Sequence, residues 1–112
     1  MTDPQRGEVW LVDLGYVAKV RPCLVISTPV QDQDRALVTL IAHTTSPRAS
    51  RFEVEIKTRF LRSGVFDAQN LVTIPHAKLI RKLGPFRLTV GVGRNGISEM
   101  ARAVITAWSL KA

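Results

Sequence analysis

The stretch VRPCLVIS, residues 20–27, places Arg21 and Pro22 directly before a run of apolar, β-prone residues. A run of this kind predicts a strand that buries one or both of its faces. A guanidinium at the start of a buried strand must either reach water or face a partner with negative charge. The stretch therefore predicts a core strand and makes Arg21 a candidate ligand for an anion, with a surface ion pair as the plainer alternative.

Four further stretches within the first 74 residues also have the composition of strands. RFEVEIK alternates apolar with charged residues, which indicates one solvated face. SGVFDAQNLVTI starts at a Ser-Gly turn and contains the polar sequence DAQN, where we expect a bend. The four stretches are GEVWLVDL (7–14), RALVTLIAHTT (35–45), RFEVEIK (51–57) and SGVFDAQNLVTI (63–74). Five short strands favour a small antiparallel barrel, closed or half-closed, because closure removes exposed sheet edges.

The C-terminal part of the chain predicts helix. IPHAKLIRKLG, residues 74–84, predicts a short helical turn that begins at Pro75 and ends at Gly84. SEMARAVITAWSL, residues 98–110, has apolar residues at helical spacing and predicts a terminal helix packed on the barrel. Between them, the Gly-rich residues 85–96 predict a hairpin or a loop. Within them, GVGRNG resembles the Gly-x-Gly-x-x-Gly motif of dinucleotide sites. It lacks the preceding parallel strand and the later acidic residue that such a site needs.

Length and composition limit the class of protein. A chain of 112 residues predicts one domain over residues 1–112. No apolar run approaches the length of a membrane-spanning helix, and the N-terminus has no basic region followed by an apolar stretch. We therefore expect a cytoplasmic protein that does not enter a membrane. The single cysteine, Cys23, cannot form an internal disulfide, and we expect it to be a small buried hydrophobe.

The chain is strongly basic, with a formal net charge of +7. Up to Asp34 it has three basic and five acidic residues, whereas from Arg35 onward it has thirteen basic and four acidic residues. This asymmetry predicts a basic face that attracts a polyanion, either a nucleic acid or an acidic protein. Charges scattered over the surface for solubility are the alternative.

Metal and covalent chemistry have little support in the sequence. The two histidines, His43 and His76, stand far apart and have no cluster of carboxylates beside them, so we predict no metal site and no cofactor. No Gly-x-Ser-x-Gly elbow is present, and Cys23 has no histidine at an interpretable spacing. The sequence therefore predicts neither a metalloenzyme nor a nucleophilic triad.

Several groups suit a phosphate. Arg21 offers a planar fork of donors that fits two phosphate oxygens and stabilises charge that builds up during cleavage. HTTSPR, residues 43–48, gathers an imidazole, three hydroxyls and an arginine at the end of a predicted strand, with an ordinary turn as the alternative. His43 is a candidate acid or base near neutral pH, or else a partly buried structural residue.

Other polar residues are weaker candidates. Asp67 and Gln69 alternate within an apolar strand, so their side chains are expected on one face unless a turn or bulge intervenes. Lys78, Arg81 and Lys82 fall within about one helical turn and suit a nucleic-acid backbone, although a solvated helix face is the plainer interpretation.

Taken in order, these stretches resemble the PemK/MazF family of toxin endoribonucleases over residues 6–84. The matching segments are RGEVWLVDL, RPCLVIS, TLIAHTTS, GVFDAQNLVTI and KLIRKLG. The resemblance implies an α+β, mainly β fold, an SH3-like small antiparallel barrel with a C-terminal helix, as in PemK, MazF and CcdB. It further implies a homodimer that binds single-stranded RNA, cuts it without a metal, and is held inactive by an acidic antitoxin.

The resemblance also implies roles for individual residues. Arg21 would contact the scissile phosphate and Thr44 would orient it, while the 2′-hydroxyl attacks and leaves a 2′,3′-cyclic phosphate. Asp67 and His43 are candidates for the general base. The residues expected to contact RNA are Thr45, Ser46, Arg48, Gln69, Lys78, Arg81 and Lys82.

Two departures from the family pattern bear on activity. Phe66 and Ala68 stand where some members carry an arginine and an aspartate as acid and base, and Asp67 is displaced by one position to the other strand face. The short link GYVAKV replaces a long Gly-rich loop. The changes at Phe66 and Ala68 predict weakened activity, and the short link leaves the sequence specificity open. Two alternatives remain, a non-catalytic RNA-binding barrel and a CcdB-like binder of gyrase. Arg21 and Thr44 speak against the gyrase binder, which has no need for them.

Overall fold

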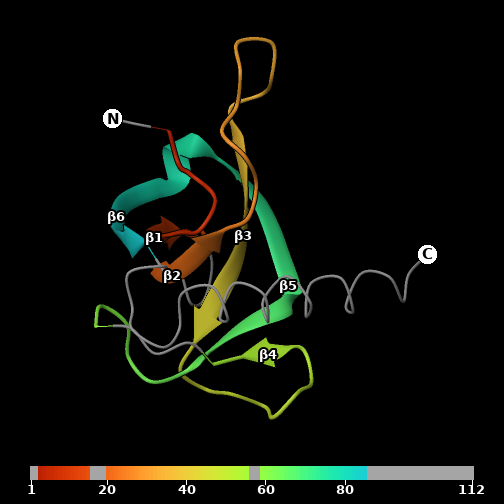
Figure 1. Ribbon diagram of the computed structural model, residues 1–112, viewed down its shortest axis with the longest axis vertical. Helices are drawn as coiled ribbons and strands as arrows, with labels where there is room; N and C mark the ends of the chain where they lie inside the picture. Colours follow the sequence, from red (N-terminus) through yellow and green to blue (C-terminus); the bar gives the residue numbers. More distant parts are fainter. Residues whose placement is uncertain (1–2, 16–19, 56–58, 86–112) are drawn as a thin grey trace, which may run out of the picture.

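The computed structural model describes residues 3–15, 20–55 and 59–85. These residues form a strongly coiled sheet and one short 3₁₀ turn, η1 (Figure 1). The strands are β1 (Glu8–Asp13), β2 (Val20–Val25), β3 (Leu37–Thr44), β4 (Glu53–Val54), β5 (Val65–Pro75) and β6 (Leu79–Pro85), and η1 is His76–Lys78. The predicted terminal helix over 98–110 and residues 86–96 of the Gly-rich stretch lie outside the described residues.

All six strands belong to one antiparallel sheet, in the order β4-β5-β3-β2-β1-β6. The first five are the predicted strands, and β6 was not predicted. Within the described residues the edge strands β4 and β6 do not pair with each other, so the sheet is open and the closed form of the predicted barrel is wrong there. β4 has only two residues, which offer too few backbone groups to close the sheet.

The centre of the sheet is buried on both faces. Because side chains alternate along a strand, each face carries its own apolar cluster. The cluster on one face, here called the Phe66 face, contains Val9, Leu24, Ile41, Val54, Phe66 and Ala68. The cluster on the other face, the Trp10 face, contains Trp10, Val12, Cys23, Val25, Val38, Leu40, Ala42 and Leu79. β2 and β3 contribute to both clusters, which explains the almost unbroken apolar run in residues 20–27.

The pairing of β5 with β3 slips where the sequence predicted a bend. Residues 67–70 of β5 stand opposite the single residue Ala42 of β3, whereas the partners on either side stay in register. Gln69 and Asn70 are both exposed, although neighbours in a regular strand point to opposite faces. The irregularity at DAQN is therefore confirmed, in the form of a register shift within one strand.

The segment after β5 is mainly a strand, so the helical turn predicted over 74–84 is wrong. Only His76–Lys78 forms a turn, and Leu79–Pro85 then pairs with β1. A segment this short makes a marginal helix in isolation, whereas pairing with β1 satisfies backbone groups of both strands. The cations Lys78, Arg81 and Lys82 consequently do not share a helix face.

Candidate functional site

Arg21 and Thr44 lie at the same end of the sheet on neighbouring strands. β2 and β3 are antiparallel with Cys23 opposite Ala42, so continuing this register by two residues brings Arg21 opposite Thr44. The Thr44 hydroxyl oxygen accepts a hydrogen bond of 3.1 Å from the backbone N–H of Ser46, which leaves its own hydrogen available to donate. The fold thus brings together two groups that the sequence predicted at one phosphate.

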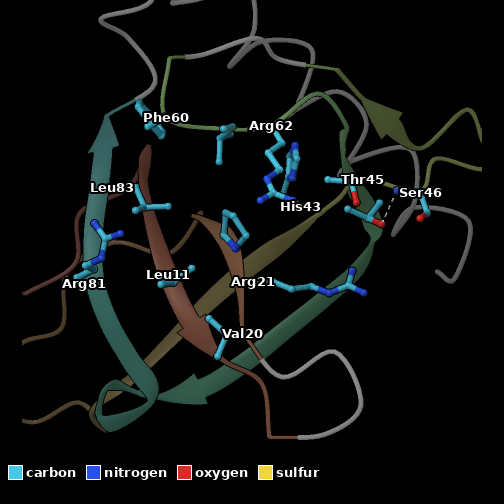
Figure 2. A pocket seen from close by; sticks show the side chains of 13 residues that line it. Leu11, Val20, Arg21, His43, Thr45, Ser46, Phe60, Arg62, Arg81 and Leu83 are labelled. Carbon is cyan, nitrogen blue, oxygen red and sulfur yellow. Dashed lines mark hydrogen bonds between the residues drawn. The ribbon is translucent and has the colours of Figure 1, made fainter.

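A hollow of about 620 Å³ opens beside this pair on the Phe66 face, and we call it the apolar hollow. Three arginines, Arg21, Arg62 and Arg81, line it together with apolar side chains. Figure 2 shows the Arg21 side chain extending to the side where Thr45 lies, with Arg81 on the opposite side. The apolar lining residues are Leu11, Val20, Pro22, Phe60, Leu61 and Leu83. Such a wall suits a ligand that has a flat apolar part and a negative charge.

A second hollow of about 490 Å³ lies on the Trp10 face, and we call it the polar hollow. Two carboxylates, Glu53 and Asp67, face it together with the cations of Arg21 and Arg48 and the amide of Asn70. Its apolar lining residues are Leu14, Ala42 and Val72. The charges of this hollow are balanced, whereas those of the apolar hollow are all positive.

The two hollows meet at a rim formed by Arg21, Thr44 and Ser46, which line both. The neighbouring residues His43 and Ala42 each line only one hollow, the apolar and the polar one respectively, as expected for adjacent residues of a strand. The rim therefore stands at the end of the sheet between its two faces. An anion held there has an open compartment on each side.

The loop between β3 and β4 is held in shape by Glu53. Its carboxylate accepts hydrogen bonds from the backbone N–H groups of Arg48 and Ser50, at 2.9 to 3.1 Å. Between these two residues, Ala49 has a φ of 59°, a left-handed conformation that residues with a Cβ seldom adopt. The contacts to Glu53 offset the cost of this tight turn and hold the loop that carries Ser46 and Arg48.

His43 is a buried histidine at the wall of the apolar hollow. Its side chain is 3% exposed, and its ring meets Phe66 edge-on with the centroids 5.0 Å apart. Its Nε2 has no hydrogen-bond partner within the described residues. Burial lowers the pKa of His43, and the positive charge of Arg21 lowers it further. The imidazole is therefore neutral near pH 7 and able to accept a proton.

Cys23 is fully buried on the Trp10 face. Burial raises the pKa of its thiol to about 12, although the positive charge of Arg21 acts in the opposite direction. The thiol is therefore protonated at neutral pH and cannot serve as a nucleophile. The prediction of a small buried hydrophobe is confirmed.

The predicted RNA-binding residues divide into two groups. Thr45, Ser46, Arg48 and Arg81 line one hollow or both. The other three do not: Gln69 and Lys78 are exposed residues outside both linings, and Lys82 forms an ion pair of 3.2 Å with Glu8. Contact of these three with RNA stays a prediction.

Three polar or charged lining residues were not singled out from the sequence as candidates, namely Glu53, Arg62 and Asn70. Asn70 belongs to the polar DAQN, but no local signal shows that the register shift turns it into a hollow. The alternation of RFEVEIK placed Glu53 on a solvated face, and nothing local indicated that the preceding loop folds back onto it. Arg62 lies before the Ser-Gly turn, where composition alone carries no signal.

No group of three or more His, Cys, Asp or Glu side chains converges within residues 3–15, 20–55 and 59–85. The same part of the chain has no helix long and apolar enough to cross a membrane.

The fold and the rim define a small basic β protein with groups suited to a phosphate at the end of its sheet. The sequence profile of the PemK-like, MazF-like toxins of type II toxin-antitoxin systems matches residues 5–90. The chain therefore belongs to the PemK/MazF family and is a MazF-like toxin of a toxin-antitoxin system.

Solved structures share this fold. An endoribonuclease in complex with its cognate antitoxin, from mycobacterial species, is 26% identical over 96% of each chain, with a TM-score of 0.77. The Mycobacterium tuberculosis toxin MazF-mt6 is 24% identical over 91% of this chain and 96% of its own, with a TM-score of 0.72. A MazE-MazF structure from Deinococcus radiodurans is 17% identical over 95% of each chain, with a TM-score of 0.74. No curated protein sequence matches the chain.

Proposed function

We propose that this toxin is an endoribonuclease that cuts single-stranded RNA without a metal. The observation that carries the proposal is the rim, where Arg21 and Thr44 both line two open hollows. Membership of the PemK/MazF family supports it, as do structural neighbours that are named endoribonucleases.

The rim supplies two of the groups that phosphodiester cleavage requires. The Arg21 guanidinium binds two non-bridging oxygens and stabilises the charge that develops as the 2′-oxygen attacks phosphorus. The Thr44 hydroxyl, whose oxygen is already engaged by Ser46, donates its hydrogen to the phosphate and sets its orientation. The bond between the 2′-oxygen and phosphorus forms as the bond to the 5′-oxygen breaks, and the 5′-oxygen takes up a proton from water, which leaves a 2′,3′-cyclic phosphate and a 5′-hydroxyl.

The proton of the 2′-hydroxyl needs an acceptor, and two residues qualify. His43 lines the apolar hollow and is neutral because burial lowers its pKa, whereas Asp67 lines the polar hollow. Each hollow also contains Arg21 and Thr44. Phe66 and Ala68, which replace titratable residues of some family members, are fully buried in the core and have no proton to exchange.

The same surface accounts for the partners that we propose. The net charge of +7 attracts single-stranded RNA and also an acidic antitoxin, which competes with RNA for the arginines of the apolar hollow. Two structural neighbours are complexes with a cognate antitoxin or with MazE. We expect a homodimer, as the resemblance to the family implied, and we expect it to act in the cytoplasm, as the sequence predicted.

The test is cleavage of single-stranded RNA by the purified protein in the presence of EDTA. We expect fragments that end in a 2′,3′-cyclic phosphate. The substitutions Arg21→Ala and Thr44→Ala should each lower the rate by at least about a hundred-fold, the usual loss when a transition-state donor is removed. Arg35→Ala is the matched control, because Arg35 is exposed and lines neither hollow. Circular dichroism and thermal unfolding establish that each variant is folded.

Each other outcome selects a different function. Full-rate cleavage by the Arg21→Ala, Thr44→Ala double variant would remove the assignment of the rim. RNA binding without cleavage by the unmodified protein would indicate the non-catalytic RNA-binding barrel. Inhibition of gyrase by a protein that leaves RNA intact would indicate the CcdB-like binder.

A further inference from the structure

We infer that the polar hollow selects the base of one nucleotide next to the scissile phosphate, favouring bases with an exocyclic amino group over uracil. This inference rests on the proposed function and adds the sequence preference of the enzyme. It is carried by the position of the hollow, by its free hydrogen-bonding groups and by its contrast with the apolar hollow.

The position follows from the shared rim. A phosphate bound by Arg21 and Thr44 sits where the two hollows meet. In an RNA chain one nucleoside lies on each side of a phosphate, so one is directed toward each hollow. The hollows measure about 620 and 490 Å³, and both volumes lie within the usual range of small-ligand sites.

The two hollows differ in the way they can hold a base. In the apolar hollow, Phe60 and Leu61 offer flat or apolar contacts, and Arg62 and Arg81 offer positive charge. Stacking and charge accept every nucleotide, because every base has a flat face and every nucleotide has an anionic phosphate. In the polar hollow, Asp67 and Asn70 can hydrogen-bond to the edge of a base, and the edge is what distinguishes one base from another. Discrimination therefore belongs to the polar hollow.

Not all polar groups of this hollow are free to read a base. The Glu53 carboxylate is occupied by backbone N–H groups of its own loop. One oxygen of Asp67, Oδ1, accepts the Gln69 N–H at 3.0 Å, whereas its Oδ2 has no hydrogen bond within the described part of the chain. The Asn70 side-chain amide likewise has none there. The register shift in β5 brings Asn70 to this hollow and leaves Gln69 outside it.

These free groups determine which bases fit. An ionised carboxylate only accepts hydrogen bonds, so Oδ2 of Asp67 pairs with the amino group of adenine, cytosine or guanine. Uracil has no amino group, and its one donor on the Watson–Crick edge, N3–H, lies between two carbonyl oxygens, which the carboxylate repels. The Asn70 amide both donates and accepts, and it can bond the ring nitrogen or carbonyl beside the amino group. Asp67 therefore disfavours uracil at this position, and Asn70 holds the edge of the base against the Asp67 carboxylate.

The experiment maps cleavage sites in a pool of single-stranded RNA with a randomised region. For the unmodified protein, one of the two positions flanking the cut should favour amino-bearing bases over uracil by at least about five-fold, the lower bound for one good edge contact. Asn70→Ala and Asp67→Asn should each reduce this ratio several-fold at that position and leave the other position unchanged. Gln33→Ala, an exposed amide that lines neither hollow, is the matched control and should keep the unmodified profile.

The outcomes separate this inference from the function on which it rests. Cleavage with an unchanged profile in both the Asn70→Ala and the Asp67→Asn variants overturns the inference and leaves the ribonuclease intact. In another outcome, Asp67→Asn lowers the cleavage rate equally at every site and Asn70→Ala keeps the unmodified profile. This outcome makes Asp67 the general base and overturns its role in base selection. An altered profile in Gln69→Ala but not in Asn70→Ala contradicts the assignment of the reading amide. Absence of cleavage by the unmodified protein overturns both.

Discussion

Pro22 explains why the site opens beside Arg21. The residue before a proline is confined to extended backbone, which sets the direction from which the Arg21 side chain leaves β2. Proline also lacks a backbone N–H, and the ladder between β2 and β3 begins only after it, at Cys23 opposite Ala42. Arg21 and Thr44 therefore face each other beyond the last ladder pair, and their side chains border open space instead of core.

His43 makes stability depend on pH. Because its pKa is lowered in the folded protein, the unfolded chain binds a proton more readily than the folded one. The contribution of neutral His43 to stability is fully present above a pH of about 6.5, the ordinary pKa of histidine. It is lost as the pH falls through the lowered pKa of His43 in the folded protein. We expect the melting temperature of the unmodified protein to fall over this window, and to fall less in His43→Leu, as measured by thermal unfolding at a series of pH values.

His76→Gln is the control for this prediction, because His76 lies in η1 outside both apolar clusters. Its melting temperature should follow that of the unmodified protein across the whole window. If the melting temperatures of the unmodified protein and of His43→Leu change with pH in parallel, burial of His43 does not cause the loss of stability at low pH.

At the scale of the elements, the junction between β3 and β5 depends on a close backbone approach. Gly64 precedes β5, and a Cβ placed on it would lie 2.2 Å from the Thr44 carbonyl oxygen and 2.7 Å from Cε1 of His43. Real Cβ atoms do not come so near to a backbone oxygen, so only glycine lets the start of β5 lie against the end of β3. The positions of Thr44 and His43 thus depend on Gly64, a residue that has no functional group in its side chain.

We therefore predict that Gly64→Ala shifts the end of β3 and with it the Thr44 hydroxyl. Overpacking of this kind costs about 1 to 3 kcal/mol in the free energy of unfolding. Because small displacements of a positioning group are costly, RNA cleavage should fall by roughly ten- to a hundred-fold. Denaturant unfolding and the cleavage assay measure the two effects. The neighbouring Ser63→Ala, at an exposed position, should change neither, and full stability and activity in Gly64→Ala would contradict the contact.

At the scale of the whole molecule, positive charge converges on one side of the sheet. Arg62 and Arg81 come from a loop and from β6, and the fold places them with Arg21 around the apolar hollow. A polyanion that binds there releases counterions, so its affinity must fall as salt is added. The basic composition therefore attracts a polyanion to one particular site only because folding brings arginines from distant segments together.

This predicts a particular salt dependence for RNA binding. In the Thr44→Ala background, where we expect RNA to be cut at least about a hundred-fold more slowly, the logarithm of affinity should fall linearly with the logarithm of salt concentration. Arg81→Gln removes one contact with the RNA backbone and should reduce the magnitude of that slope by about 0.7, the contribution of one phosphate contact on a single strand. Fluorescence anisotropy with a labelled oligonucleotide measures it. Arg35→Gln, outside both hollows, should leave the slope unchanged, and an equal change in the two variants would mean that only net charge matters.

The sequence by itself determined the features that depend on local pattern. Alternation and composition indicated β1 to β5, the position of Cys23 in the core and the irregularity at DAQN, because each is set by neighbouring residues. The order of the stretches around Arg21 and Thr44 also indicated the family. The predicted terminal helix belongs to the same kind of inference and stays a prediction.

Only the tertiary structure decided the features that depend on pairing between distant segments. Whether residues 79–85 formed helix or strand depended on the free edge of β1, which no local pattern reveals. Whether Gln69 or Asn70 enters the polar hollow depended on a register shift against β3. The opposition of Arg21 and Thr44 likewise depended on the antiparallel register of β2 and β3. Register is a relation between two strands, and the sequence of either strand alone does not contain it.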